Sequence, residues 1–171
     1  MAVRVLPYSE SWPRLFADAS EPLTQALSRW LVGGIEHIGS TSVPGLAAKP
    51  ILDMLAPVDD LHAARDAIPV LADLGYLHSD HRPDEALWFY KQQGEDYGTR
   101  THQLHLTRPD SKLWIERLAF RDALRDNPSL AAEYQDLKQA LARSPGNLSD
   151  YTNGKRGLVR RALANEGISL E

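Results

Sequence analysis

One loop of the chain gathers the residue types that bind phosphate. Between two apolar segments it places Gly39, three consecutive hydroxyl residues and then Lys49. The hydroxyl residues are Ser40, Thr41 and Ser42. Glycine lets backbone amides approach a ligand closely, and exposed amides beside hydroxyl groups form a concave anion site. The pattern therefore predicts a phosphate-binding loop, although a polar connection whose glycines only turn the chain has the same composition.

A single acid, Asp53, follows this loop inside the apolar run 50–55. A carboxylate without partners is costly in a buried strand, so a metal ion, a cation or hydrogen-bond donors must meet it. A structural salt bridge would satisfy the same requirement. Lys49 and Arg100 are candidates either for contacting phosphate or for pairing with acids such as Asp53.

Two histidines, His102 and His105, lie in the strand candidate 101–107. Because they are three residues apart, a regular strand directs them to opposite faces, so one of them at most lies beside Asp53. His105 is the candidate for that place, and His102 is a candidate for phosphate binding. Imidazole suits zinc or another transition ion better than magnesium. Hydrogen-bonded structural histidines are the alternative.

The elements that must position these residues can be read from apolar spacing and breaker residues. We predict strands at 35–38, 50–55, 86–91 and 101–107, the last two joined as a hairpin. Helices are expected from Ser11 to Gly33-Gly34, with Pro22 kinking or dividing the segment, and from Asp59 or Asp60 to Gly75. Further helices start at Ser111 and are interrupted at Asn127-Pro128 and Pro145-Gly146.

This order predicts an α/β (α+β) fold, a small mixed sheet with flanking helices. We expect one domain over residues 1–171, with a helical C-terminal part over about 110–171. The net charge of −4 and the pI near 5.9 disfavour nucleic-acid binding. The chain has no cysteine and no apolar run of membrane-spanning length, so we expect a cytoplasmic protein that binds no membrane.

The run from His37 to Asp53 resembles the signature of the GrpB family, with Gly-Ser-Thr-Ser-Val-Pro-Gly-Leu followed by Lys-Pro before the acid. The segments 100–105 and 120–122, and Tyr151 with Lys155, are similar to the same family, so the resemblance covers nearly the whole chain. This family is grouped with nucleotidyltransferase-like folds, in which Gly-Ser begins a turn and an acid follows on the next strand. Here twelve residues separate Ser40 from Asp53.

The resemblance implies a metal-dependent nucleotidyltransferase that moves a nucleoside monophosphate from an NTP to a small-molecule acceptor. Asp53 would bind Mg²⁺ or Mn²⁺, with His105 as its candidate catalytic partner. The predicted substrate- and phosphate-binding residues are Gly39, Ser40, Thr41, Ser42, Lys49, Arg100, His102 and Lys155.

One departure from the pattern of enzymes with this fold keeps three functions open. Their usual acid-x-acid pattern is broken by Leu55, and the strand 101–107 contains no acid. The chain can therefore be the transferase, a non-catalytic nucleotide- or phosphate-binding module, or a metal-dependent hydrolase. The hydrolase would need His102 or His105 to converge with Asp53, for example on Zn²⁺. The oligomeric state, the base and the acceptor stay open.

Overall fold

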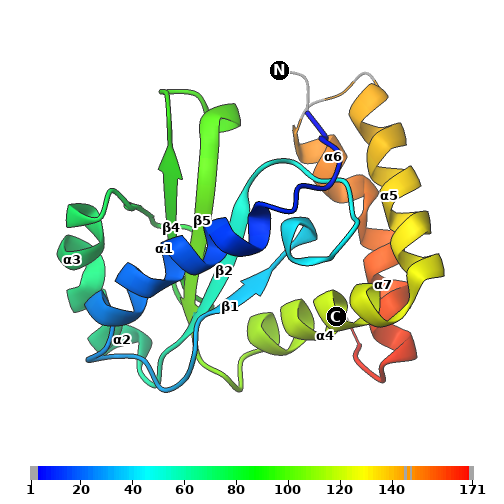
Figure 1. Ribbon diagram of the computed structural model, residues 1–171. Helices are drawn as coiled ribbons and strands as arrows, with labels where there is room; N and C mark the ends of the chain where they lie inside the picture. Colours follow the sequence, from blue (N-terminus) through cyan, green and yellow to red (C-terminus); the bar gives the residue numbers. More distant parts are fainter. Residues whose placement is uncertain (1–3, 145, 147, 170–171) are drawn as a thin grey trace.

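A five-stranded mixed sheet forms the centre of the fold, with the strand order β1-β2-β5-β4-β3 (Figure 1). The computed structural model describes residues 4–144, 146 and 148–169. Strands β2 and β5 run parallel, and the other neighbouring strands pair antiparallel. The predicted small mixed sheet with flanking helices is confirmed. The strands are β1 (Glu36–Ile38), β2 (Leu52–Pro57), β3 (Leu77–Ser79), β4 (Leu87–Gln92) and β5 (Arg100–Thr107).

Strand β2 directs alternate residues to the two faces of the sheet, as the strand geometry requires. Met54 and Ala56 face the larger core, which is covered by helices α1 (Trp12–Ala26), α2 (Leu61–Ala64) and α3 (Ile68–Asp73). Asp53 and Leu55 therefore face the other side. The Asp53 side chain thus points away from the main core.

Helix α4 (Lys112–Asp126) covers the Asp53 face of the sheet. Ser111 caps its first turn by accepting the Trp114 N–H. Leu113 then packs against Ile38 and Leu55. The helix runs from this contact along the sheet toward the C-terminal helices (Figure 1).

The remaining helices gather beyond the end of the sheet (Figure 1). They are α5 (Pro128–Arg143), α6 (Leu148–Gly154) and α7 (Arg156–Asn165). A second apolar cluster fixes them onto the predicted phosphate loop, through Val43, Leu46, Leu124, Tyr134 and Leu158. The C-terminal helices therefore form one wall of any site at that loop.

Two predicted helices differ from the structure. Helix α1 continues through Pro22, whose ring is exposed, and ends at Ala26, well before Gly33-Gly34. The segment predicted up to Gly75 forms α2, a short 3₁₀ turn and α3, because Pro69 fits the first turn of a helix better than its middle.

Three further differences concern segments without strong periodicity. The three-residue strand β3 and the helix α6 were not predicted. Tyr151 lies in α6, and Lys155 directly precedes α7. The break at Asn127-Pro128 is confirmed, whereas Pro145 lies outside the described residues.

Among the described helices, none has the length and apolar character that crossing a membrane requires.

Candidate phosphate-binding site

The Gly39 backbone lies directly against the Asp53 carboxylate. Ile38 and Asp53 are register partners in the β1-β2 pair, and Gly39 follows with φ 73° and ψ −176°. A Cβ atom built at Gly39 would stand 2.5 Å from Asp53 Oδ2. Both the conformation and the space therefore require glycine. Ser40 to Ser42 then form a 3₁₀ turn, and the Ser40 side chain lies near the Tyr134 phenol.

Asp53 is half-buried and, within the described part of the chain, forms no hydrogen bond or ion pair. Burial raises the pKa of its carboxyl group, while Arg117, Lys49 and Lys155 act in the opposite direction. The charges of these three side chains act on the Asp53 carboxylate, although none of the three forms an ion pair with it among the described residues. Asp53 is therefore left without the partner that a carboxylate in this setting requires.

Three lysines lie near one another beside the loop, two of them against one aromatic ring. The Nζ atoms of Lys49 and Lys155 lie 5.1 Å and 4.6 Å from the centre of the Tyr151 ring. Burial, together with Lys49, lowers the pKa of Lys155 to about 8. Lys138 is fully buried, donates a hydrogen bond to the Ala47 carbonyl and has its pKa lowered to about 7 by burial and by the other two lysines.

Arg117 completes this set from helix α4. It acts electrostatically on Asp53, His105, Tyr134 and Lys155, and so lies among groups that come from β2, β5, α5 and the start of α7. Arg117, Lys138 and Tyr134 were not predicted as site residues. For Arg117 a signal existed, because it is a charged residue one turn after the buried Leu113 on the sheet-facing side of its helix.

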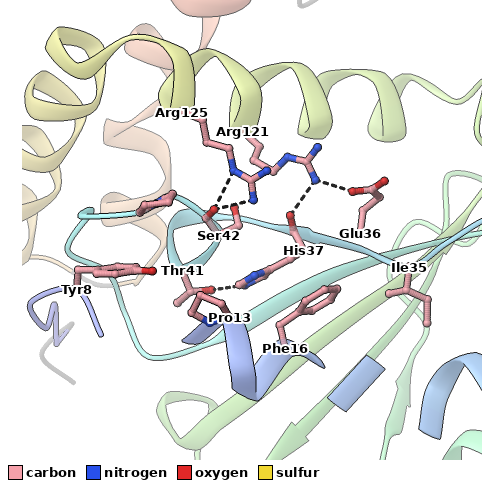
Figure 2. Close-up of a pocket in the computed structure, with 11 residues that line it drawn as sticks. Tyr8, Pro13, Phe16, Ile35, Glu36, His37, Thr41, Ser42, Arg121 and Arg125 are labelled. Atoms are coloured by element: carbon pink, nitrogen blue, oxygen red, sulfur yellow. Dashed lines mark hydrogen bonds and ion pairs between the residues drawn. The ribbon is translucent and has the colours of Figure 1, made fainter. Parts of the chain in front are cut away.

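The backbone of the loop and of strand β1 is held by arginines of helix α4. Arg125 donates from Nε and one terminal nitrogen to the Ser42 carbonyl, at 3.0 and 2.8 Å (Figure 2). Arg121 donates to the His37 carbonyl at 3.1 Å and to Glu36 at 2.7 Å. The Arg121 side chain is only 11% exposed, so it is not part of a solvated charged face of the helix.

A hollow of about 270 Å³ lies behind the loop, between α1 and these two arginines (Figure 2). There His37 stacks on Phe16 with ring centres 4.7 Å apart, and its Nε2 is 2.9 Å from Thr41 Oγ1. The Thr41 hydroxyl gives its single proton to the Ile51 carbonyl, so His37 Nε2 must donate. Burial and the arginines lower the pKa of His37 to about 4, which keeps it neutral.

The predicted residues of the loop therefore divide into two groups. Gly39 and Ser40 lie toward Asp53 and Tyr134. The Thr41 hydroxyl is used on Ile51 and His37, and the Ser42 hydroxyl donates to the Gly39 carbonyl. Thr41 and Ser42 are both buried, so their hydroxyl groups stabilise the conformation of the loop.

The predicted strand residues divide in the same way. His105 lies on the Asp53 face, beside Leu55, while His102 pairs with Leu52 on the opposite face and has its ring edge-on to Tyr76. Burial lowers the pKa of His105 to about 3; its ring contacts Trp88, and its Nδ1 has no hydrogen-bond partner.

Arg100 lies near the site. Its guanidinium lies 4.0 Å from the centre of the Tyr90 ring. Tyr90 is opposite Gln103, and Gln103 is in turn the neighbour of Asp53 on strand β5. The structure therefore brings Gly39, Ser40, Lys49 and Lys155 together with Asp53, places Arg100 and His105 farther along the same face, and leaves His102 outside.

The donor set does not fit a pair of divalent metal ions. Leu55, two residues after Asp53 on the same face, is fully buried in apolar surroundings, and the neighbours on β5 are Gln103 and His105. No group of three His, Cys, Asp or Glu side chains that could hold a metal occurs among the described residues. Asp53 is thus the one carboxylate of this row, where a magnesium pair needs several oxygen ligands.

Solved structures of other proteins share this fold, a mixed sheet with flanking helices. The structure of the GLD-2/RNP-8 complex matches 90% of this chain and 60% of that one, with a TM-score of 0.59 and 8% identity. The H336N mutant of the Cid1 poly(U) polymerase bound to MgATP matches 87% and 50%, with a TM-score of 0.50 and 15% identity. At these identities the likeness concerns the fold alone.

The chain belongs to the GrpB protein family, whose model matches residues 2–165. A crystal structure of the conserved protein GrpB from Enterococcus faecalis superposes with a TM-score of 0.82 and 30% identity, covering 96% of this chain and 100% of that one. The predicted family is thereby confirmed.

Relatives by sequence extend the same family. The glutamate-rich protein GrpB of Alkalihalophilus pseudofirmus is 35% identical, with 94% of both chains covered. A UPF0157 protein of Pseudomonas aeruginosa is 39% identical over 94% of this chain, which spans 66% of that protein's length.

Proposed function

We propose that this chain binds the phosphate groups of a nucleoside triphosphate in the site formed by Gly39, Ser40 and Asp53. The observation that carries the proposal is the charge imbalance around Asp53. Three basic side chains, Lys49, Arg117 and Lys155, act on this single carboxylate, and none of them forms an ion pair with it among the described residues. A fourth, Lys138, lies close enough to Lys49 and Lys155 for their charges to lower its pKa.

Several positive charges held close together repel one another, and a bound polyanion would stabilise them. Burial, and after it the repulsion between neighbouring lysines, lowers the pKa values of Lys138 and Lys155 to about 7 and about 8. A phosphate chain would restore the balance and would receive charge-assisted hydrogen bonds from the same groups. The backbone amides beside Gly39 would add donors for it.

Isothermal titration calorimetry with ATP and with inorganic triphosphate tests the proposal. Lys155→Gln should weaken binding by about 10- to 100-fold, because one charge-assisted hydrogen bond contributes about 1.5–3 kcal/mol. Lys112→Gln is the matched control, since Lys112 is an exposed lysine of α4 paired only with Glu116. Equal affinities for the two variants and the wild type, or no binding by the wild type, would rule the site out.

Transfer of a nucleoside monophosphate to a small-molecule acceptor is the second function we propose for this site. It is favoured by the position of Asp53, which faces the Gly-Ser turn from the next strand. A small acceptor is expected because the net charge of −4 disfavours nucleic acid. Release of pyrophosphate from NTPs in the presence of Mg²⁺ or Mn²⁺ and pooled metabolites tests it.

The Asp53→Asn variant separates transfer from binding alone. It keeps the size of the side chain and removes the carboxylate charge. Turnover by the wild type that disappears in Asp53→Asn would support a transferase. Triphosphate binding with no pyrophosphate release would instead support a non-catalytic binding module.

We do not extend the hydrolase hypothesis to this site. His102 lies on the opposite face of the sheet from Asp53, and His105 is buried against Trp88 beside Leu55. A zinc site needs three or four convergent ligands, and the described residues bring no third one to Asp53 and His105.

A further inference from the structure

The place where the fold would carry a second metal-binding acid is occupied by apolar core. Leu55 follows Asp53 by two residues and shares its face of β2, as the alternation of a strand requires. It is fully buried and packs with Ile38, Ala86 and Leu113. Burying a carboxylate among these side chains would be costly, so the position is built for an apolar residue.

The neighbouring strand supplies no negative charge either. Gln103 stands beside Asp53 and His105 beside Leu55. Gln103 is uncharged, and His105 is a buried imidazole in contact with Trp88. A divalent ion placed here would therefore meet one carboxylate and several cations, which is a poor environment for Mg²⁺.

Arg117 of α4 lies close enough to this same row of the sheet for its charge to act on both Asp53 and His105. It follows Leu113, which is anchored on Leu55, by one helical turn, and it precedes Leu118, which packs on the same cluster. It forms no hydrogen bond or ion pair with any described residue, whereas Arg121 and Arg125, the next two arginines on that side of the helix, are both bonded. More than a third of Arg117 is exposed, so a ligand can reach it.

We infer that Arg117 supplies positive charge in place of a second metal ion. This site would then bind a triphosphate through cationic side chains without requiring a divalent cation. The inference rests on the proposed function and specifies its ligand as the metal-free polyphosphate. A guanidinium presents parallel N–H donors that match two phosphate oxygens, and it stays charged at every accessible pH. Lys49 and Lys155 would contact the chain from the other side of Asp53.

Calorimetric titration of inorganic triphosphate and of ATP in EDTA and in excess Mg²⁺ tests this inference. Wild-type protein should bind both ligands in EDTA at least as tightly as with Mg²⁺. Arg117→Ala should lose about 10- to 100-fold in affinity in EDTA, the value of one charge-assisted contact, and Arg117→Lys should recover part of it.

Arg14→Ala serves as the control, because it removes one exposed positive charge from α1, on the other face of the sheet. A thermal melt of each variant establishes that it is folded, and Arg117→Lys provides the same comparison if the alanine variant is not.

The outcomes separate this inference from the function on which it rests. Binding that appears only with Mg²⁺, or an Arg117→Ala variant with wild-type affinity in EDTA, would overturn the role of Arg117 and leave triphosphate binding standing. Failure of the wild-type protein to bind either ligand under both conditions would overturn both.

Discussion

The contact between Gly39 and Asp53 shows how single residues define this site. The glycine has a positive φ and an extended ψ, a combination that residues with a side chain avoid, and its missing Cβ leaves room for Asp53 Oδ2. This brings the backbone of the loop against the carboxylate. An anion bound at the loop would therefore be close to Asp53 as well.

Gly39→Ala should both destabilise the protein and weaken triphosphate binding. The backbone strain alone costs about 1–3 kcal/mol. The new methyl group would in addition displace Asp53, since it would stand 2.5 Å from Oδ2. Chemical denaturation gives the first effect and calorimetric titration the second.

Gly45→Ala is the matched control for this substitution. Gly45 also has a positive φ, of 80°, but a Cβ built there meets no atom within 4 Å. The control should show the cost of backbone strain with little loss of triphosphate affinity. Similar affinities for the two variants would mean that the Gly39-Asp53 contact has no part in binding.

At the scale of elements, helix α4 connects the sheet to the loop through three arginines spaced four residues apart. Arg117, Arg121 and Arg125 share one side of the helix. The last two bind carbonyls of the loop, and Glu36 and Asp122 offset part of their charge. The same helix therefore fixes the loop at one end and directs a free guanidinium over Asp53's face at the other.

Arg125→Lys should loosen the loop while preserving the charge. A lysine cannot reproduce the two parallel hydrogen bonds that Arg125 donates to the Ser42 carbonyl. We expect a loss of about 1 kcal/mol in stability, faster amide hydrogen exchange in the loop and weaker triphosphate binding.

Arg108→Lys, at an exposed arginine paired with Asp110, should change none of these measurements. Unchanged exchange rates at the loop in Arg125→Lys would show that the clamp is not needed to hold it.

For the whole molecule, the convergence of lysines makes ligand binding depend on pH. In the free protein the pKa values of Lys138 and Lys155 lie at about 7 and about 8, below their value of 10.5 in the unfolded chain. As the pH falls from 10.5 toward these values, the unfolded chain takes up protons that the folded protein does not. The free protein should therefore lose stability over that range.

A bound polyanion favours the charged lysines and reverses this effect. Triphosphate binding at about pH 8.5 should be coupled to proton uptake, and its affinity should fall as the pH rises above about 8. Calorimetry in two buffers with different ionisation enthalpies measures the protons taken up. Lys155→Gln should reduce the uptake, whereas zero uptake in the wild-type protein would show that these lysines do not meet the ligand.

The sequence determined the parts of this protein that depend on neighbouring residues. The glycine and hydroxyl residues of the loop, the acid in an apolar strand and the opposite faces of His102 and His105 all follow from backbone geometry and spacing. The mixed sheet and the family were predicted for the same reason, because apolar periodicity and a contiguous motif are local properties.

The tertiary structure alone decided which distant side chains meet at the loop. Arg117, Tyr134 and Lys138 reach the site because α4 packs on the sheet and α5 packs on Val43 and Leu46. Such contacts depend on helix packing over long sequence separations. Local spacing indicates that Arg117 shares a side of its helix with Leu113, but not that this side covers Asp53. The same packing buried Leu55 beneath α4, so the fold that supplies the phosphate loop also leaves Asp53 as the one acid among cations.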